Sequence, residues 1–187
     1  MPPSPLDEVR PRPRRALAER FLATQSNLAI TYDRLGRHEE ALCTNRDVYN
    51  GFSKIYGEEH RHTLVAANNY AEALRNLRRF KEANVLLSKL IPAARRVFGN
   101  SHELTLMMRA NHGRMLYLDT AATLDDLREA VRTLEETERT ARRVMGSANP
   151  VTMQIEQSLQ SARAAARAAL RARESPPDEL DEVEDAD

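Results

Sequence analysis

The chain has 187 residues but no tryptophan, one cysteine and six glycines, and only 5% of its residues are aromatic. A single cysteine excludes a disulfide framework and fits a reducing compartment. No apolar run approaches the 18 residues of a membrane-spanning helix, so no span is predicted. Charged residues make up 30% of the chain. This composition is poor material for a sheet and suits helices with one apolar stripe.

The N-terminal segment, Met1 to Pro13, is rich in proline and arginine and lacks the apolar core of a secretory signal. We therefore expect no signal peptide and a cytoplasmic protein. Residues 1–15 are predicted to be disordered, because prolines interrupt regular structure.

Charge is balanced overall but unevenly placed. Glu174 to Asp187 contains eight carboxylates and no basic residue, which leaves a net charge of +8 on the rest of the chain. Acidic runs of this kind are typical of solvated, disordered tails. Residues 174–187 are predicted to form such a tail, with docking of the tail on the basic body as the alternative.

A recurring phrase is the strongest pattern in the sequence. Three glycines, Gly57, Gly99 and Gly146, each end a basic-apolar-apolar triplet and lie 42 and then 47 residues apart. Each is followed after three residues by His or Asn and after six by Thr. A long repeat built from helix-stop and helix-start signals predicts a solenoid of stacked helical hairpins.

Apolar periodicity between these signals predicts seven helices. Their ranges are 16–35, 39–56, 61–77, 80–98, 103–118, 124–145 and 150–173. Pro92 is expected to kink the fourth. Residues 119–123 lengthen the third turn by five residues, Thr123 and Asp126 form a plausible capping pair, and Asn149 is expected to cap the last helix.

Small residues recur in register with the repeat. Ala29, Ala71 and Gly113 occupy one position, and Ala41, Ala83 and Ala130 occupy another. Small side chains let two helices cross closely, because a larger side chain would separate their backbones. Cys43 has no counterpart in the other repeats, and we expect it to be buried within a helix pair.

The pattern resembles the tetratricopeptide repeats (TPR) of the 42-residue, kinesin-light-chain-like kind. Matching residues are Ser26-Asn27-Leu28-Ala29, Leu35-Gly36-Arg37-His38-Glu39-Glu40-Ala41 and Gly57-Glu58-Glu59-His60-Arg61-His62-Thr63-Leu64, followed by Asn68-Asn69-Tyr70-Ala71. The resemblance covers about residues 20–170. It implies an all-α, right-handed superhelical solenoid of about three hairpins, at about 16–57, 58–99 and 100–146, with a capping helix at 150–173.

The same resemblance implies an inner face that binds extended peptides. Asn27, Asn69 and Asn111 form a ladder at one position per repeat, with Asn68 beside the middle rung. An asparagine can both donate to and accept from a peptide backbone, independent of peptide sequence. The alternative is that these asparagines satisfy neighbouring helices.

The residues three and six positions beyond each ladder asparagine are expected to face the same groove. The pairs are Ile30 and Asp33, Glu72 and Arg75, and Arg114 and Tyr117. Arginine forms bidentate bonds with carboxylates, so Arg75 and Arg114 favour acidic peptide segments. The predicted groove therefore consists of Asn27, Asn68, Asn69, Glu72, Arg75, Asn111 and Arg114.

Other kinds of site find little support in the sequence. His60 and His62 lack the spacing of a zinc pair, and no phosphate-binding loop or catalytic triad stands out, so neither a metal nor a cofactor is predicted. Arg163, Arg167 and Arg171 form a basic stripe that keeps nucleic-acid binding as a lesser alternative.

The predicted function is non-catalytic binding of a protein or peptide, as an adaptor or scaffold, with no small-molecule substrate. The main alternative is a piece of a longer repeat array that serves as a structural or oligomerisation module. Self-association through an uncovered repeat end is the expected sign of that alternative.

Overall fold

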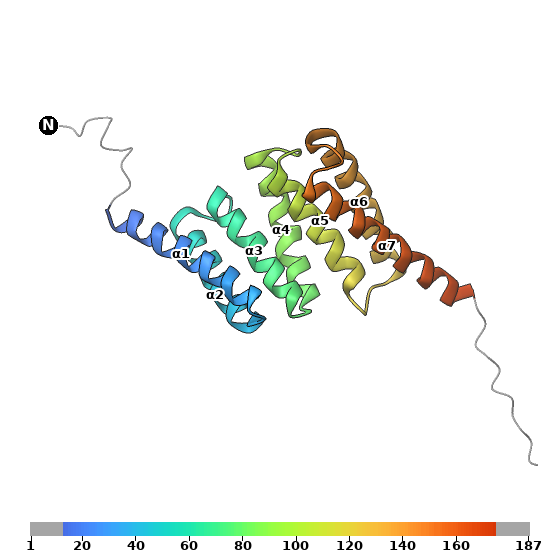
Figure 1. Cartoon of the computed structure of the whole chain (residues 1–187), viewed down its shortest axis with the longest axis horizontal. Coiled ribbons are helices and arrows are strands. Elements are labelled where there is room, and N and C mark those ends of the chain that lie inside the picture. The colour runs from blue at the N-terminus through green and yellow to red at the C-terminus, as the bar shows by residue number, and fades with distance from the viewer. Residues whose placement is uncertain (1–12, 175–187) are drawn as a thin grey trace, which may run out of the picture.

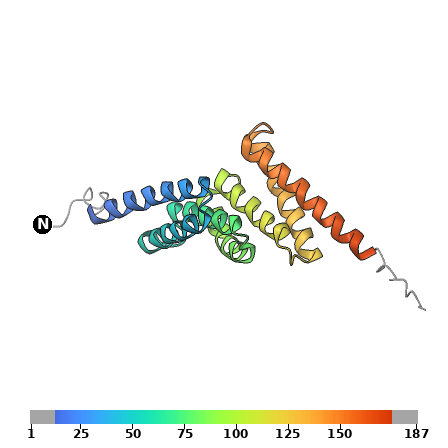
Figure 2. The same ribbon diagram turned by 60° about the horizontal axis from the view of Figure 1, so that its bottom comes forward.

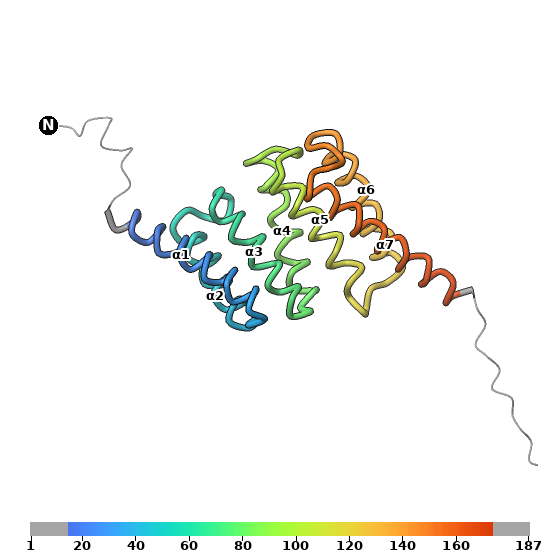
Figure 3. Tube along the Cα trace, viewed as in Figure 1, coloured from blue at the N-terminus to red at the C-terminus, as the bar shows by residue number. Residues whose placement is uncertain are grey.

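The structure is a computed structural model that describes residues 13–174. Residues 1–12 of the predicted N-terminal segment and 175–187 of the predicted acidic tail lie outside that range, whereas residues 13–15 begin the first helix and Glu174 ends the last one. The described chain forms seven helices and no strand. They are α1 (Pro13–Arg34), α2 (His38–Tyr56), α3 (Arg61–Asn76), α4 (Phe80–Phe98), α5 (Glu103–Leu118), α6 (Leu124–Met145) and α7 (Pro150–Glu174). Figure 1 and Figure 3 show them in chain order, running alternately in opposite directions.

Each helix packs mainly against the next one along the chain, and α5 also contacts α3 and α7. The first helices of the hairpins therefore form one layer and the second helices the other, with α1 and α7 at opposite ends of the row (Figure 2). This arrangement confirms the predicted all-α solenoid of three hairpins and a closing helix. None of the described helices is long and apolar enough to cross a membrane.

The helices of each hairpin cross at the predicted small residues. Ala29, Ala71 and Gly113 are buried, as are their partners Ala41, Ala83 and Ala130. A Cβ atom built on Gly113 would lie 2.8 Å from Cγ of Leu134 and 3.4 Å from the carbonyl oxygen of Ala130. The backbones of α5 and α6 therefore approach closely enough to exclude a side chain at this position.

The recurring phrase is confirmed as the linker between hairpins. Gly57, Gly99 and Gly146 have φ of 87°, 95° and 84°, a region that L side chains rarely adopt. Three residues on, His60 and His102 accept a hydrogen bond at Nδ1 from the backbone N–H two residues later, each at 3.2 Å. Asn149 accepts the equivalent bond at 2.8 Å. The phrase therefore consists of a helix stop, a turn and an N-cap.

The lengthened third turn has its own internal bonding. Asp119 accepts a hydrogen bond from the N–H of Ala121. Thr123 and Asp126 form a reciprocal capping box at the start of α6, as predicted. The turn is thereby held in a defined shape against the end of α5.

Two helices of the first two hairpins contain residues with specific local expectations, Cys43 in α2 and Pro92 in α4. Cys43 is exposed on α2, so the prediction that it would be buried was wrong. Its position falls on the outer side of a helix whose buried residues include Ala41, Leu42 and Asn45. Helix α4 continues through Pro92 from Phe80 to Phe98.

The histidine caps lead to a prediction about pH. Burial, followed by the charges of His62 and Arg15, holds the pKa of His60 below its ordinary value of 6.5, and burial also lowers the pKa of His112. The unfolded chain then binds protons more readily than the folded one. Stability should be constant above about pH 6.5 and decline as the pH falls below it, by a few degrees of Tm measured by circular dichroism.

The variant His60→Asn provides the matched control, because Asn149 already performs the same capping role in this chain. Asparagine does not titrate, so this variant should lose the share of the pH dependence that belongs to the cap and keep the share that belongs to His112. An unchanged pH profile in His60→Asn would show that the cap does not contribute.

Candidate functional site

The inner layer of first helices carries a connected polar network. Asn68 on α3 and Asn111 on α5 are only 3% and 4% exposed. Nδ2 of Asn111 donates to Oδ1 of Asn68 at 3.1 Å. These two residues lie 43 positions apart, whereas the repeat is 42 residues long. Asn69 is the repeat equivalent of Asn111, so the bond joins Asn111 to the residue before that equivalent.

Charged side chains extend this network toward solvent. Arg114 donates to Oδ1 of Asn111 at 3.2 Å and lies 3.7 Å from a carboxylate oxygen of Glu72. Arg75 donates from Nε to the other oxygen of Glu72 at 2.8 Å. The side chains of Arg75 and Arg114 are 28% and 15% exposed. The network therefore holds two guanidinium groups in set orientations at one surface.

The remaining ladder residues are placed differently. Asn27 on α1 is exposed and Asn69 on α3 is half-buried. Within the described chain, neither side chain forms a hydrogen bond that would occupy its amide. Asp33, one of the flanking positions on α1, bonds His38 at 2.9 Å and Asn76 at 2.5 Å. It is engaged in joining α1 to α3.

A shallow depression adjoins the network between α5 and α7. Its walls combine the network's polar groups with apolar side chains of both helices; they are Glu72, Met107, Ala110, Asn111, Arg114, Val151, Gln154, Ile155 and Ser158. Of the seven predicted groove residues, Asn68 and Asn111 are buried and bonded to each other. The other five reach the surface to different extents.

The buried asparagine pair can be tested by a double-mutant cycle. Either Asn68→Leu or Asn111→Leu leaves a buried amide without its partner, and each should lower the free energy of unfolding by about 1–3 kcal/mol. The double variant should cost clearly less than the sum of the two. Urea unfolding measures all three, and strictly additive costs would contradict a coupled pair.

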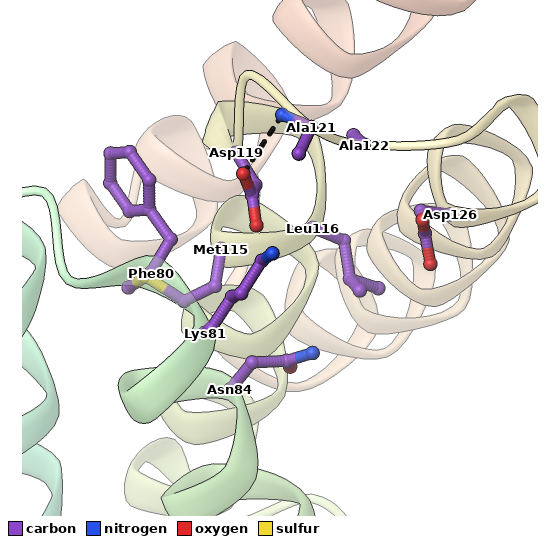
Figure 4. Close-up of a pocket in the computed structure, with 9 residues that line it drawn as sticks. All are labelled: Phe80, Lys81, Asn84, Met115, Leu116, Asp119, Ala121, Ala122 and Asp126. Carbon is purple, nitrogen blue, oxygen red and sulfur yellow. Dashed lines mark hydrogen bonds between the residues drawn. The ribbon is translucent and has the colours of Figure 1, made fainter.

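Two features away from the inner layer were missed in the sequence. The first is a pocket of about 260 Å³ between the start of α4 and the lengthened third turn. Figure 4 shows Lys81 reaching toward Asp119, with Asn84, Leu116 and Asp126 around it. Asp126 serves the capping box, and Oδ1 of Asn84 is buried without a hydrogen-bond partner in the described chain. The five-residue insertion at residues 119–123 was the sequence feature that could have indicated this pocket.

The second feature is a groove with a largely apolar lining between α2 and α4, to which α3 contributes Tyr70 and Leu74. Tyr49 and Tyr70 stack there with ring centroids 6.0 Å apart, beside Val85 and Leu86. Val85 is 69% exposed. No repeated signal marks these residues, because Tyr49 and Tyr70 occupy different positions in their repeats.

The histidines near the first linker form a ring cluster. His60 stacks on Tyr56 with centroids 4.0 Å apart, and its Nδ1 is used as the helix cap. Across the described residues, no group of three or more His, Cys, Asp or Glu side chains could hold a metal ion. Arg163, Arg167 and Arg171 all lie on the exposed side of α7.

A family model described as tetratricopeptide repeat matches residues 20–96. The fold is similar to a crystal structure of BtubC (BKLC) from P. vanneervenii, with a TM-score of 0.61 and 20% identity, covering 84% of this chain and 65% of that one. This chain therefore spans about two thirds of the length of that structure. No curated protein matches the sequence.

A second similar structure is a kinesin-light-chain-type protein of Podosopora anserina with nearly identical TPR-like repeats. It has a TM-score of 0.63 and 23% identity and covers 82% of this chain and 70% of that one. At these identities the likeness establishes the fold alone.

Proposed function

We propose that this chain, which matches the tetratricopeptide-repeat model over residues 20–96 and has a kinesin-light-chain-like fold, is a non-catalytic adaptor that binds an extended peptide segment of a partner protein. The binding surface is the inner layer of first helices, from Asn27 on α1 to the depression between α5 and α7. Repeat arrays of this kind bury little of that surface against themselves, which leaves it open to a partner.

The observation that carries the proposal is the network that holds Arg75 and Arg114. Long arginine side chains lose conformational freedom when they bind, and a pre-oriented guanidinium loses less. Asn111 and Glu72 fix Arg114 before any ligand arrives. Asn69 and Asn27 add amides that can bond a peptide backbone on the same helices.

The chemistry of this surface favours acidic peptides. The chain outside its C-terminal acidic run carries a net charge of +8. A ligand carboxylate can form bidentate bonds with a guanidinium and compete with Glu72 for it. Apolar side chains of the ligand would lie against Val151 and Ile155 in the adjoining depression.

Binding can be tested with an array of acidic 12-residue peptides and matched peptides in which Gln replaces Glu. The full chain should select acidic members, and Asn69→Ala combined with Arg114→Ala should weaken their binding at least ~10-fold, the loss of about 1.4 kcal/mol. Fluorescence anisotropy measures the Kd. The matched control is Arg139→Ala, an exposed arginine on α6 in the other layer.

Retention of the same peptides at the same affinity by the double variant would contradict the proposed surface. Loss of binding in the Arg139→Ala control would show that net charge, rather than the inner face, governs selection.

A second function is favoured by the outer side of α1. Leu17, Phe21 and Leu28 on α1 are 70%, 60% and 44% exposed, and Leu35, directly after the end of α1, is 66% exposed. They follow one another at helical spacings on a single face, interrupted by threonines at positions 24 and 31. A row of large apolar side chains open to water is characteristic of an interaction surface.

The occupant we propose for this face is α1 of a second copy. The opposite end of the solenoid is unsuited to it, because the exposed side of α7 carries mainly glutamine, arginine and alanine. A head-to-tail contact would place apolar side chains against that polar face. A contact between two α1 helices buries the same apolar patch on both copies and closes as a symmetric dimer.

A further inference from the structure

An open groove between α6 and α7 combines arginines with an apolar floor. Arg128 and Arg132 line it from α6, and Arg163 and Arg167 line it from α7. Val131, Ala166 and Leu170 form the floor, and Glu135 is its single acidic lining residue. We call this the arginine groove. It lies at the opposite end of the row of helices from α1 and shares no lining residue with the depression between α5 and α7.

The arginines of this groove are available for a stronger anionic partner. Arg128 pairs with Asp125, Arg132 with Glu129, and Arg163 with Glu135. The side chains of Arg128 and Arg132 remain 64% and 68% exposed in these pairs. Exposed pairs of this kind contribute little and exchange readily. Arg167 forms no ion pair within the described residues.

The described part of the chain ends close to this groove. Helix α7 runs antiparallel to α6, and Leu170 on the groove floor is only four residues before its end at Glu174. The next residues are Ser175, Pro176 and Pro177. Prolines cannot continue a helix, so they favour a change of chain direction at this point.

The segment that follows is complementary to the groove. Residues 178–187 contain seven carboxylates, no basic residue, and two larger apolar side chains, Leu180 and Val183. Ten extended residues span up to ~35 Å. The groove residues of α7, from Arg163 to Leu170, cover about 10 Å of helix. The segment can therefore reach the whole groove by folding back.

We propose that residues 178–187 occupy the arginine groove of their own chain. Leu180 and Val183 cover Val131 and Leu170, and the carboxylates bind the surrounding guanidinium groups. The contact covers apolar surface at the last hairpin and neutralises part of the basic stripe on α7. It leaves the inner face free, so the acidic segment acts as a cover for the end of the solenoid and does not compete with a peptide ligand.

The absence of tryptophan makes a single reporter informative. In the full chain carrying Leu180→Trp, emission should be blue-shifted and acrylamide quenching several-fold weaker than in a synthetic peptide of residues 174–187 with the same substitution. Adding Arg128→Gln and Arg167→Gln, or raising NaCl to ~1 M, should restore the peptide-like values, because salt screens exposed charges. The matched control replaces Arg139 and Arg143, both exposed on α6, with glutamine and should keep the protection.

Three outcomes of the reporter experiment overturn the proposal. The reporter could be as exposed in the full chain as in the peptide. Its protection could be abolished by Arg114→Gln, which would place the segment on the inner face, or it could depend on protein concentration, which would place it on another copy. The unsubstituted chain gives an independent readout by NMR. Deleting residues 178–187 should shift the amide resonances of Val131, Ala166 and Leu170 but not that of Ala71, and unchanged resonances at the groove would equally exclude docking.

Discussion

Replacing Gly113 with valine is expected to lower the free energy of unfolding by about 3 kcal/mol, the upper part of the range for overpacked cores. The first added carbon meets Cγ of Leu134 at 2.8 Å, and Leu134 is fully buried. The backbone of Ala130 limits movement on the other side, with its carbonyl oxygen at 3.4 Å. Helices α5 and α6 must separate, and urea unfolding followed by circular dichroism measures the cost.

The control is the same substitution at Gly51 in α2. An added Cβ there meets only the Leu22 side chain, with Cδ2 at 2.6 Å, Cδ1 at 3.0 Å and Cγ at 3.3 Å, and no backbone atom. Leu22 lies on α1, the terminal helix, which packs mainly against α2 and can shift. Because the change in helix propensity is the same at both sites, the difference isolates the crossing. Equal costs at Gly51 and Gly113 would contradict the close approach of α5 and α6.

Replacing Leu17 and Phe21 together with glutamine is expected to convert self-associated protein into monomer. Both side chains are at least 60% exposed on α1, so their replacement removes apolar surface from the proposed dimer contact with little effect on the core. The dissociation constant should rise at least ~100-fold, a loss of about 2.8 kcal/mol. Sedimentation equilibrium over a range of concentrations measures it.

The matched control for this double variant is Val85→Gln. Val85 is 69% exposed but stands on α4, in the other layer. It should leave the association unchanged. A chain that is monomeric at all accessible concentrations before any substitution would contradict the dimer. Equal weakening by Val85→Gln would place the contact on the groove between α2 and α4, beside Tyr49 and Tyr70.

The repeat could be predicted from the sequence because it depends on interactions between residues that are close together in the chain. Gly57, Gly99 and Gly146 terminate helices through positive φ, which glycine adopts without a steric cost. Asn149 and the pair of Thr123 and Asp126 begin helices by bonding nearby N–H groups. These interactions involve residues within one turn of each other, so their spacing along the chain reports them directly.

Contacts between repeats were harder to predict from the sequence. The asparagine ladder followed the 42-residue period, yet the hydrogen bond joins Asn68 to Asn111 at a spacing of 43. A side chain on one helix leans toward a neighbouring helix whose residues are offset along the axis, and that offset is a property of the packing. Cys43 was misplaced for a related reason, since helical spacing alone does not define which residues at the margin of an apolar stripe remain exposed.

The sequence by itself determined the helices, their order, the hairpin connections and the small residues at each crossing, because these depend on neighbouring residues and on a repeated period. Only the tertiary structure determined which polar side chains are paired with one another. It buried Asn68 and Asn111 against each other, oriented Arg114 through Glu72, and brought Arg128 and Arg163 to one groove. Such pairings depend on the distance and rotation between packed helices, which no spacing along the chain specifies.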